Sequence, residues 1–199
     1  MKILALELST ARGGLAWLDD DTQLEREWSN DRKNSGPFFE NLQGVITMFG
    51  APDIIVVGLG PGSYARTRIA ISAAIGLQAS SGARLIGYPS ICAMESEGHE
   101  YCVIGDARRT SFFFARIREH NLLEGPNLLS ESELREKIQR ANVSVFATEE
   151  LPQFDRVQIR YPSARILARL AQDPNRAFVL APLEPMYLRE PHITTPGSR

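Results

Sequence analysis

The sequence predicts an α/β protein in which mixed β-sheets carry helices on their faces. Three strand patterns follow one another between residues 3 and 28 with only turns between them, as in an antiparallel meander. Helix and strand patterns then alternate as far as residue 87. A meander followed by alternating helices and strands gives a sheet of mixed direction. With 199 residues, of which 43% are hydrophobic, the chain can bury the core of one large or two small domains.

The first half of the chain predicts five strands and two helices. Short apolar runs bounded by glycine or aspartate turns mark the strands. Pro37 marks the start of the first helix, because proline suits the first helical turn, and the sequence Gly-Ala-Pro at 50–52 ends that helix. The expected strands are residues 3–8, 15–18, 23–28, 54–57 and 84–87, and the expected helices are residues 35–49 and 63–80.

The second half predicts a smaller set of elements. Ser130 and Glu133 have the spacing of a capping box, in which each side chain bonds the other residue's backbone at the start of a helix. The other expected elements are strands at residues 101–104, 112–117 and 143–147 and a helix at residues 163–171.

These elements predict two lobes. We expect the first lobe to span residues 1–100 and the second residues 101–190, and we allow for a final helix that packs back on the first lobe. The tail, residues 191–199, carries two prolines and a glycine with few apolar residues, so we expect it to be poorly ordered.

The most informative segment is a glycine-rich turn after the strand at 54–57. Gly58, Gly60 and Gly62 supply a flexible bend, and Ser63 can cap the following helix. Backbone N–H groups in such a turn can bind an anion. The spacing nevertheless matches neither a P-loop, which needs a lysine, nor a dinucleotide fingerprint, which needs glycine in place of Ser63. Two interpretations stay open: an anion site, or a tight connection between strand and helix.

The helix after this turn is rich in small residues. It is either an ordinary buried helix or one whose low surface lets another protein approach closely. The small residues are Ala70, Ala73, Ala74 and Gly76.

Composition excludes several classes of protein. The net charge of −2 gives no electrostatic footprint for strong, unaided binding to nucleic acid. Cys92 and Cys102 form neither a metal-binding spacing nor a disulfide framework. We find no apolar stretch of roughly 18 residues and no signal-peptide pattern, and we expect a cytoplasmic protein that does not enter a membrane.

Four segments resemble one bacterial family in the order in which that family carries them. ILALELST at residues 3–10 is similar to ILAIDTST, and GPGSYARTRIAISAAIGL at 60–77 is similar to GPGSFTGLRIGxAxAKGL. DARRTSFF at 106–113 is similar to DARRGEVY, and PMYLR at 185–189 matches P-x-YLR. On these segments the chain resembles the TsaB (YeaZ) proteins, which are relatives of the actin-like, sugar-kinase and Hsp70 (ASKHA) fold.

The resemblance implies two ribonuclease H-like (ASKHA) lobes and a noncatalytic role without a cofactor. It implies a scaffold or activator subunit of the complex that forms N6-threonylcarbamoyladenosine at position 37 of ANN-decoding tRNAs. The implied partners are a TsaD-like transferase and a TsaE-like ATPase, with tRNA met only within the complex.

The sequence departs from the family pattern at three places. Glu7 replaces the aspartate of the first strand, which is either drift in a protein that needs no metal or a retained metal ligand. Asn34, Ser35 and Gly36 stand where the family carries His-Ser-Glu. Arg66 puts a cation in the first turn of a helix, against the helix dipole, and it either meets an acidic partner or a phosphate or is simply solvated.

Two enzyme classes remain as alternatives. A nucleotide-binding kinase or ATPase of the ASKHA type would bind Mg-ATP at the cleft near Glu7. A metallopeptidase of the glycoprotease type would need a metal site, but His99, His120 and His192 do not form the helical histidine pair of the catalytic relative TsaD.

The resemblance places the partner surface on the first two helices, which would also support a homodimer. The first helix agrees, because its apolar residues extend over more than one face. The expected interface residues are Phe38, Phe39, Leu42, Ile46, Arg66, Arg68, Ile71, Ala74 and Ile75. The residues of a vestigial nucleotide cleft are Glu7, Ser9, Gly60, Gly62 and Ser63.

Overall fold

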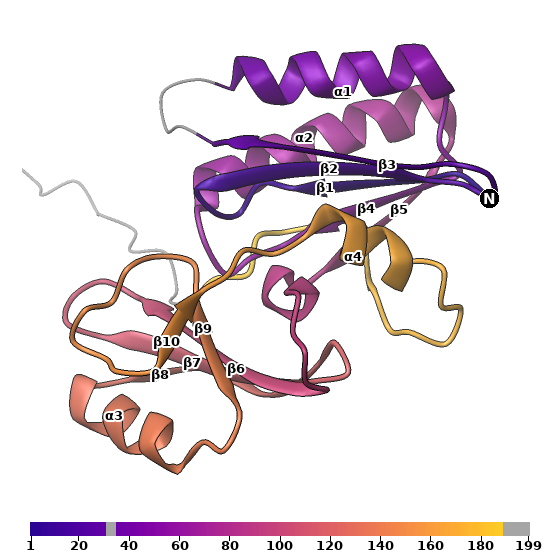
Figure 1. Ribbon diagram of the computed structural model, residues 1–199. Helices are drawn as coiled ribbons and strands as arrows, with labels where there is room; N and C mark the ends of the chain where they lie inside the picture. The colour runs from indigo at the N-terminus through magenta and orange to yellow at the C-terminus, as the bar shows by residue number, and fades with distance from the viewer. Residues whose placement is uncertain (31–34, 189–199) are drawn as a thin grey trace, which may run out of the picture.

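The computed structural model describes residues 1–30 and 35–188 and shows two β-sheets packed with helices (Figure 1). Both sheets contain parallel and antiparallel neighbours. The predicted α/β class, with two lobes of mixed sheet, is therefore confirmed. The tail at residues 191–199, whose order we predicted to be poor, lies outside the described residues.

The first sheet has six strands. They are β1 (Ile3–Glu7), β2 (Arg12–Leu18), β3 (Gln23–Ser29), β4 (Ile54–Gly58), β5 (Arg84–Tyr88) and β11 (Val179–Leu180), in the spatial order β11-β5-β4-β1-β2-β3. Strand β1 runs parallel to β4 and antiparallel to β2. Every residue of β1 and β4 is buried, as expected for apolar strands covered on both faces.

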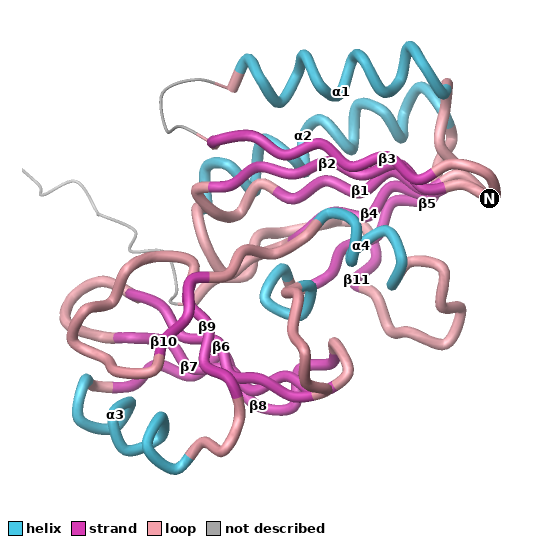
Figure 2. The backbone as a smooth tube through the Cα atoms, viewed as in Figure 1, coloured by secondary structure: helices cyan, strands magenta, loops and turns pink. Residues whose placement is uncertain are grey.

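Helices cover both faces of this sheet. Helices α1 (Gly36–Phe49) and α2 (Tyr64–Ser81) lie on one face, and α4 (Ala164–Leu170) with the 3-10 turn η1 (Ser90–Ala93) lies on the other (Figures 1 and 2). No helix in the described part of the chain is long and apolar enough to cross a membrane.

The second sheet has five strands and one covering helix. The strands are β6 (Glu100–Asp106), β7 (Phe112–Arg118), β8 (Asn121–Leu129), β9 (Ser144–Ala147) and β10 (Val157–Ile159), in the order β10-β9-β6-β7-β8. Helix α3 (Glu131–Arg140) packs on one face through Leu134 and Ile138. The predicted capping box of α3 is confirmed, since Ser130 N donates to Glu133 Oε2 (2.8 Å) and Glu133 N donates to Ser130 Oγ (3.4 Å).

The two sheets share one apolar cluster. Ile3 and Val56 of the first sheet belong to the same cluster as Tyr101 and Phe113 of the second. Leu167 of α4 lies within this cluster and is fully buried. Helix α4 therefore packs on the first sheet and contributes to the apolar cluster that joins the two lobes.

Each element expected from the sequence is present with a boundary shift of three residues or fewer, but three strands were missed. The largest miss is β8, which contains Gly125 and Pro126. That dipeptide is typical of a turn, yet here it sits in a bulged edge strand where Gly125 has φ 82° and lies against the Phe114 carbonyl. Strands β10 and β11 are three and two residues long and carry no distinct pattern.

Truncation of Leu167 tests the shared cluster. Leu167→Ala removes buried methyl groups and leaves a cavity, so we expect a loss of about 2–5 kcal/mol in the free energy of unfolding, measured by urea denaturation. Leu123→Ala is the control, because Leu123 is 51% exposed and its truncation should cost no more than about 0.5 kcal/mol. Equal effects of the two substitutions would contradict the packing of α4.

Candidate functional site

Glu7 ends the central strand of the first sheet and is fully buried. Its Oε1 atom accepts a hydrogen bond from the Ser9 amide (2.7 Å), and its Oε2 atom occupies the space that a Cβ atom at position 58 would need. Gly58 is therefore required where β4 passes this carboxyl. Burial raises the pKa of Glu7, and its polar contacts with Ser9 and Ser90 only partly oppose the rise. A carboxyl that favours its neutral form in a packed interior is a poor ligand for a metal ion.

The glycine-rich turn is bonded to its own chain. Ser63 N donates to Ser9 O (2.6 Å), and Gly60 N donates to Ser90 Oγ (2.9 Å). Gly62 lies so close to Ser9 that a side chain there would overlap the Ser9 carbonyl. These two N–H groups, which an anion site would use, already have acceptors. The geometry thus favours a tight connection between β4 and α2 over an anion site.

Four of the residues expected at the partner surface belong instead to the core, and this part of the expectation is wrong. Phe38 and Leu42 of α1 and Ile71 and Ala74 of α2 are buried in one cluster with the first sheet. The reason is geometric: both helices lie on the same face of the sheet, and these four side chains point into it. Ala74 is fully buried, so a large residue there disturbs folding before it disturbs a partner.

The other expected interface residues differ in exposure. Phe39, Arg68 and Ile75 are exposed, and Ile46 is half-buried. Arg66 is also half-buried, and its guanidinium donates to Asn30 O (2.8 Å), which joins the start of α2 to the end of β3. Neither interpretation of Arg66 from the sequence included this bond.

The exposed surface of α1 and α2 carries large apolar side chains. We call this surface the outer helix face. It is made of Phe39 (49% exposed), Met48 (63%), Tyr64 (45%) and Ile75 (49%), with Arg68 and the small residues Gly44 and Gly76. A Cβ atom at Gly44 or at Gly76 would meet nothing within 4 Å. The two glycines therefore leave room for another helix to approach this face, and the packing of the chain itself does not require them.

Sequence reasoning missed Met48 and Tyr64 as members of this face. Tyr64 lies against Tyr187, with ring centroids 5.2 Å apart, and Arg68 Nη1 donates to the Tyr64 hydroxyl (3.1 Å). The segment that carries Tyr187 is held to the turn before α2, since Met186 N donates to Leu59 O (2.7 Å). The PMYLR segment thus places an aromatic ring on the first turn of α2, a contact between residues too distant in sequence for any local pattern to predict.

The described residues contain no group of three or more histidine, cysteine, aspartate or glutamate side chains that could hold a metal ion. His120 Nδ1 lies 2.8 Å from the Cys92 carbonyl, and His192 lies outside the described residues. Burial raises the pKa of the Cys92 thiol to about 12 and that of Cys102 to about 11. Both thiols are protonated at neutral pH and are weak nucleophiles.

Comparison with solved structures finds proteins of similar fold. No protein-family model matches the sequence, and no curated protein matches it. A solved structure from Pseudomonas aeruginosa, described as an uncharacterized protein with similarity to peptidase YEAZ, matches with a TM-score of 0.77 and 21% identity over 94% of this chain and 99% of that chain. YeaZ from Pseudomonas aeruginosa matches with a TM-score of 0.72 and 19% identity over the same shares. The fold implied by the resemblance to TsaB (YeaZ) is confirmed.

The buried carboxyl of Glu7 predicts a pH effect on stability. The unfolded state loses this proton near the ordinary value of 4.5, but the folded state keeps it to a higher pH. Stability therefore falls as pH rises from 4.5 toward the folded pKa. The Glu7→Gln side chain is neutral at every pH, so the variant does not lose this stability. We therefore expect the difference between the melting temperatures of Glu7→Gln and the parent to shift in favour of the variant as pH rises to about 7. Glu150→Gln, at an exposed position, is the control, and a pH-independent difference for Glu7→Gln would contradict the assignment.

The bonded turn predicts weak or no binding of nucleotide. Because the Gly60 and Ser63 N–H groups have acceptors and Glu7 is sealed from solvent, calorimetry with Mg-ATP should show no binding with a dissociation constant in the low micromolar range, which corresponds to a binding free energy of about −8 kcal/mol. Saturable binding in that range that Glu7→Ala abolishes would favour a nucleotide-binding enzyme instead.

Proposed function

We propose that this chain belongs to the TsaB (YeaZ) family and is a noncatalytic scaffold of the complex that forms N6-threonylcarbamoyladenosine at position 37 of ANN-decoding tRNAs. The observation that carries the proposal is the fold shared with YeaZ over 94% of this chain and 99% of that chain. The four segments that resemble the family lie in the same order along this chain and support it. The proposed partners are a TsaD-like transferase, a TsaE-like ATPase and, within the complex, tRNA.

The outer helix face is the surface that we assign to the TsaD-like partner. It carries four large exposed apolar side chains on two neighbouring helices, and aromatic residues and methionine are enriched at protein interfaces relative to the rest of the surface. Gly44 and Gly76 let a facing helix approach closely. A homodimer through the same face is compatible with this assignment, since a two-fold contact pairs one patch with itself.

The proposed role is noncatalytic because the best candidate chemical groups are used for packing. Glu7 is buried over Gly58, and the turn from Gly60 to Ser63 bonds Ser9 and Ser90. In this proposal these residues hold the start of α2 in place, and α2 in turn presents the outer helix face. Any chemistry then belongs to the partner.

Gly76→Arg is the variant that tests the interface. The site has room for a side chain, and arginine favours a helix more than glycine does, so folding should be unaffected or improved. A bulky cation within the helix contact should weaken binding to the TsaD-like protein from the same organism by thirtyfold or more, roughly 2 kcal/mol. Binding is measured by calorimetry, and the melting temperature of each variant is measured alongside.

Two further variants make the result interpretable. Leu123→Arg places the same charge on β8, away from the outer helix face, and should bind normally. Ala74→Arg should lose folding, because Ala74 is buried in the core. If Gly76→Arg and Ile75→Arg both bind as tightly as the parent while remaining folded, the assignment of this face is wrong.

A further inference from the structure

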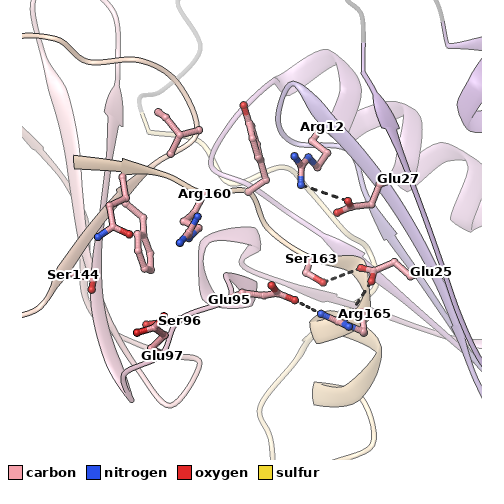
Figure 3. A pocket seen from close by; sticks show the side chains of 14 residues that line it. Arg12, Glu25, Glu27, Glu95, Ser96, Glu97, Ser144, Arg160, Ser163 and Arg165 are labelled. Atoms are coloured by element: carbon pink, nitrogen blue, oxygen red, sulfur yellow. Dashed lines mark hydrogen bonds and ion pairs between the residues drawn. The ribbon is translucent and has the colours of Figure 1, made fainter. Parts of the chain in front are cut away.

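A cavity of about 960 Å³ lies between the two lobes (Figure 3). Glu25 and Glu27 of β3 line one wall, and Gln158 and Ile159 of β10 line the other. Arg160, directly after β10, projects into the space between these walls (Figure 3). The volume exceeds what a single amino acid or a simple inorganic ion fills, and it lies within the range of ligand-binding cavities.

Most charges around the cavity are already paired. Arg165 of α4 lies between Glu25, at 3.4 Å, and Glu95, which it contacts directly. Arg12 pairs with Glu27 at 3.4 Å. In contrast, neither Arg160 nor Glu97 makes an ion pair with any residue in the described ranges, and both side chains are exposed. One cation is thus available for an acidic group.

The mixed signs of the lining restrict the class of ligand. The lining holds three arginines and four glutamates, so a compact polyanion such as a nucleoside triphosphate would meet several carboxylates at short range. A ligand with one acidic group and an otherwise neutral, polar body fits better. The lining also contains Ser144 and Gln158, whose uncharged polar groups can form hydrogen bonds with the amide groups of a ligand.

One wall of the cavity is an edge of a sheet. Strand β10 is the last strand of its sheet and pairs only with β9 within the described residues. The cavity touches Gln158 and Ile159 of β10 together with Ser144 and Phe146 of the neighbouring strand β9, so it borders the end of the sheet at which β10 has its free edge. The outward N–H and C=O groups of such an edge are a template for another strand.

We propose that this cavity binds an extended peptide segment, which adds as a strand to the free edge of β10 and pairs an acidic side chain with Arg160. Backbone hydrogen bonds to β10 supply affinity without regard to sequence, and the ion pair with Arg160 supplies the preference for an acidic residue. The site is separate from the outer helix face, so it does not depend on the function proposed above.

Three blocked hexapeptides of alternating valine and threonine, with glutamate, glutamine or lysine at the fourth position, test the proposal. Each is titrated into the isotopically labelled full chain and followed by nuclear magnetic resonance. We expect saturable shifts of the Gln158 and Ile159 amide signals, with the glutamate peptide bound about tenfold more tightly than the glutamine peptide and the lysine peptide weakest. N-methylation of alternate peptide amides should abolish the shifts, because it removes the strand hydrogen bonds.

Variants separate the ion pair from general effects. Arg160→Gln should remove the tenfold preference for glutamate while leaving the affinity for the glutamine peptide unchanged, and Arg160→Lys should retain part of the preference. Arg84→Gln, an exposed arginine of β5 outside the cavity, should behave as the parent. The proposal is overturned if no peptide gives saturable shifts at millimolar concentration, if the N-methylated peptide binds equally well, or if Arg160→Gln keeps the preference for glutamate.

Discussion

The apolar cluster between the two sheets is the interaction on which the rest of the structure depends. It combines side chains from β1 and β4 of the first sheet, β6 and β7 of the second, and α4 between them. Because side chains of both sheets belong to this one cluster, each sheet needs the other to bury its share of these side chains. The cavity between the lobes owes its two walls to this arrangement, with β3 on one side and β10 on the other. The packing also leaves α1 and α2 on the far face of the first sheet, where their outer surfaces remain uncovered (Figure 1).

The fold could be predicted where local pattern and tertiary environment agree. Strands β1 and β4 are apolar throughout, and the capping box of α3 is a local hydrogen-bond motif that needs no distant partner. Strand β8 could not be predicted, because its Gly125-Pro126 dipeptide is tolerated only at an edge strand with a bulge. The position of an edge is a property of the whole sheet and is not written in any short window of sequence.

The candidate site could be predicted only in part for a similar reason. The sequence indicates which helices are apolar, but α2 has small or apolar residues all round, so periodicity does not reveal which of them face the sheet. Ile71 and Ile75 look equivalent in the sequence, yet the first is buried and the second is half exposed. The contact of Tyr187 with Tyr64 and the cavity around Arg160 join residues distant in sequence, and only the assembled lobes bring them together.

The buried carboxyl of Glu7 also affects the heat of unfolding. At a pH between 4.5 and its raised folded pKa, the native chain holds a proton that the unfolded chain gives up, so unfolding releases acid into the solution. The buffer takes up that proton with its own enthalpy of protonation. The calorimetric enthalpy of this protein therefore contains a contribution from the buffer, and two buffers of equal pH but different ionisation heats yield different enthalpies for the same structural transition.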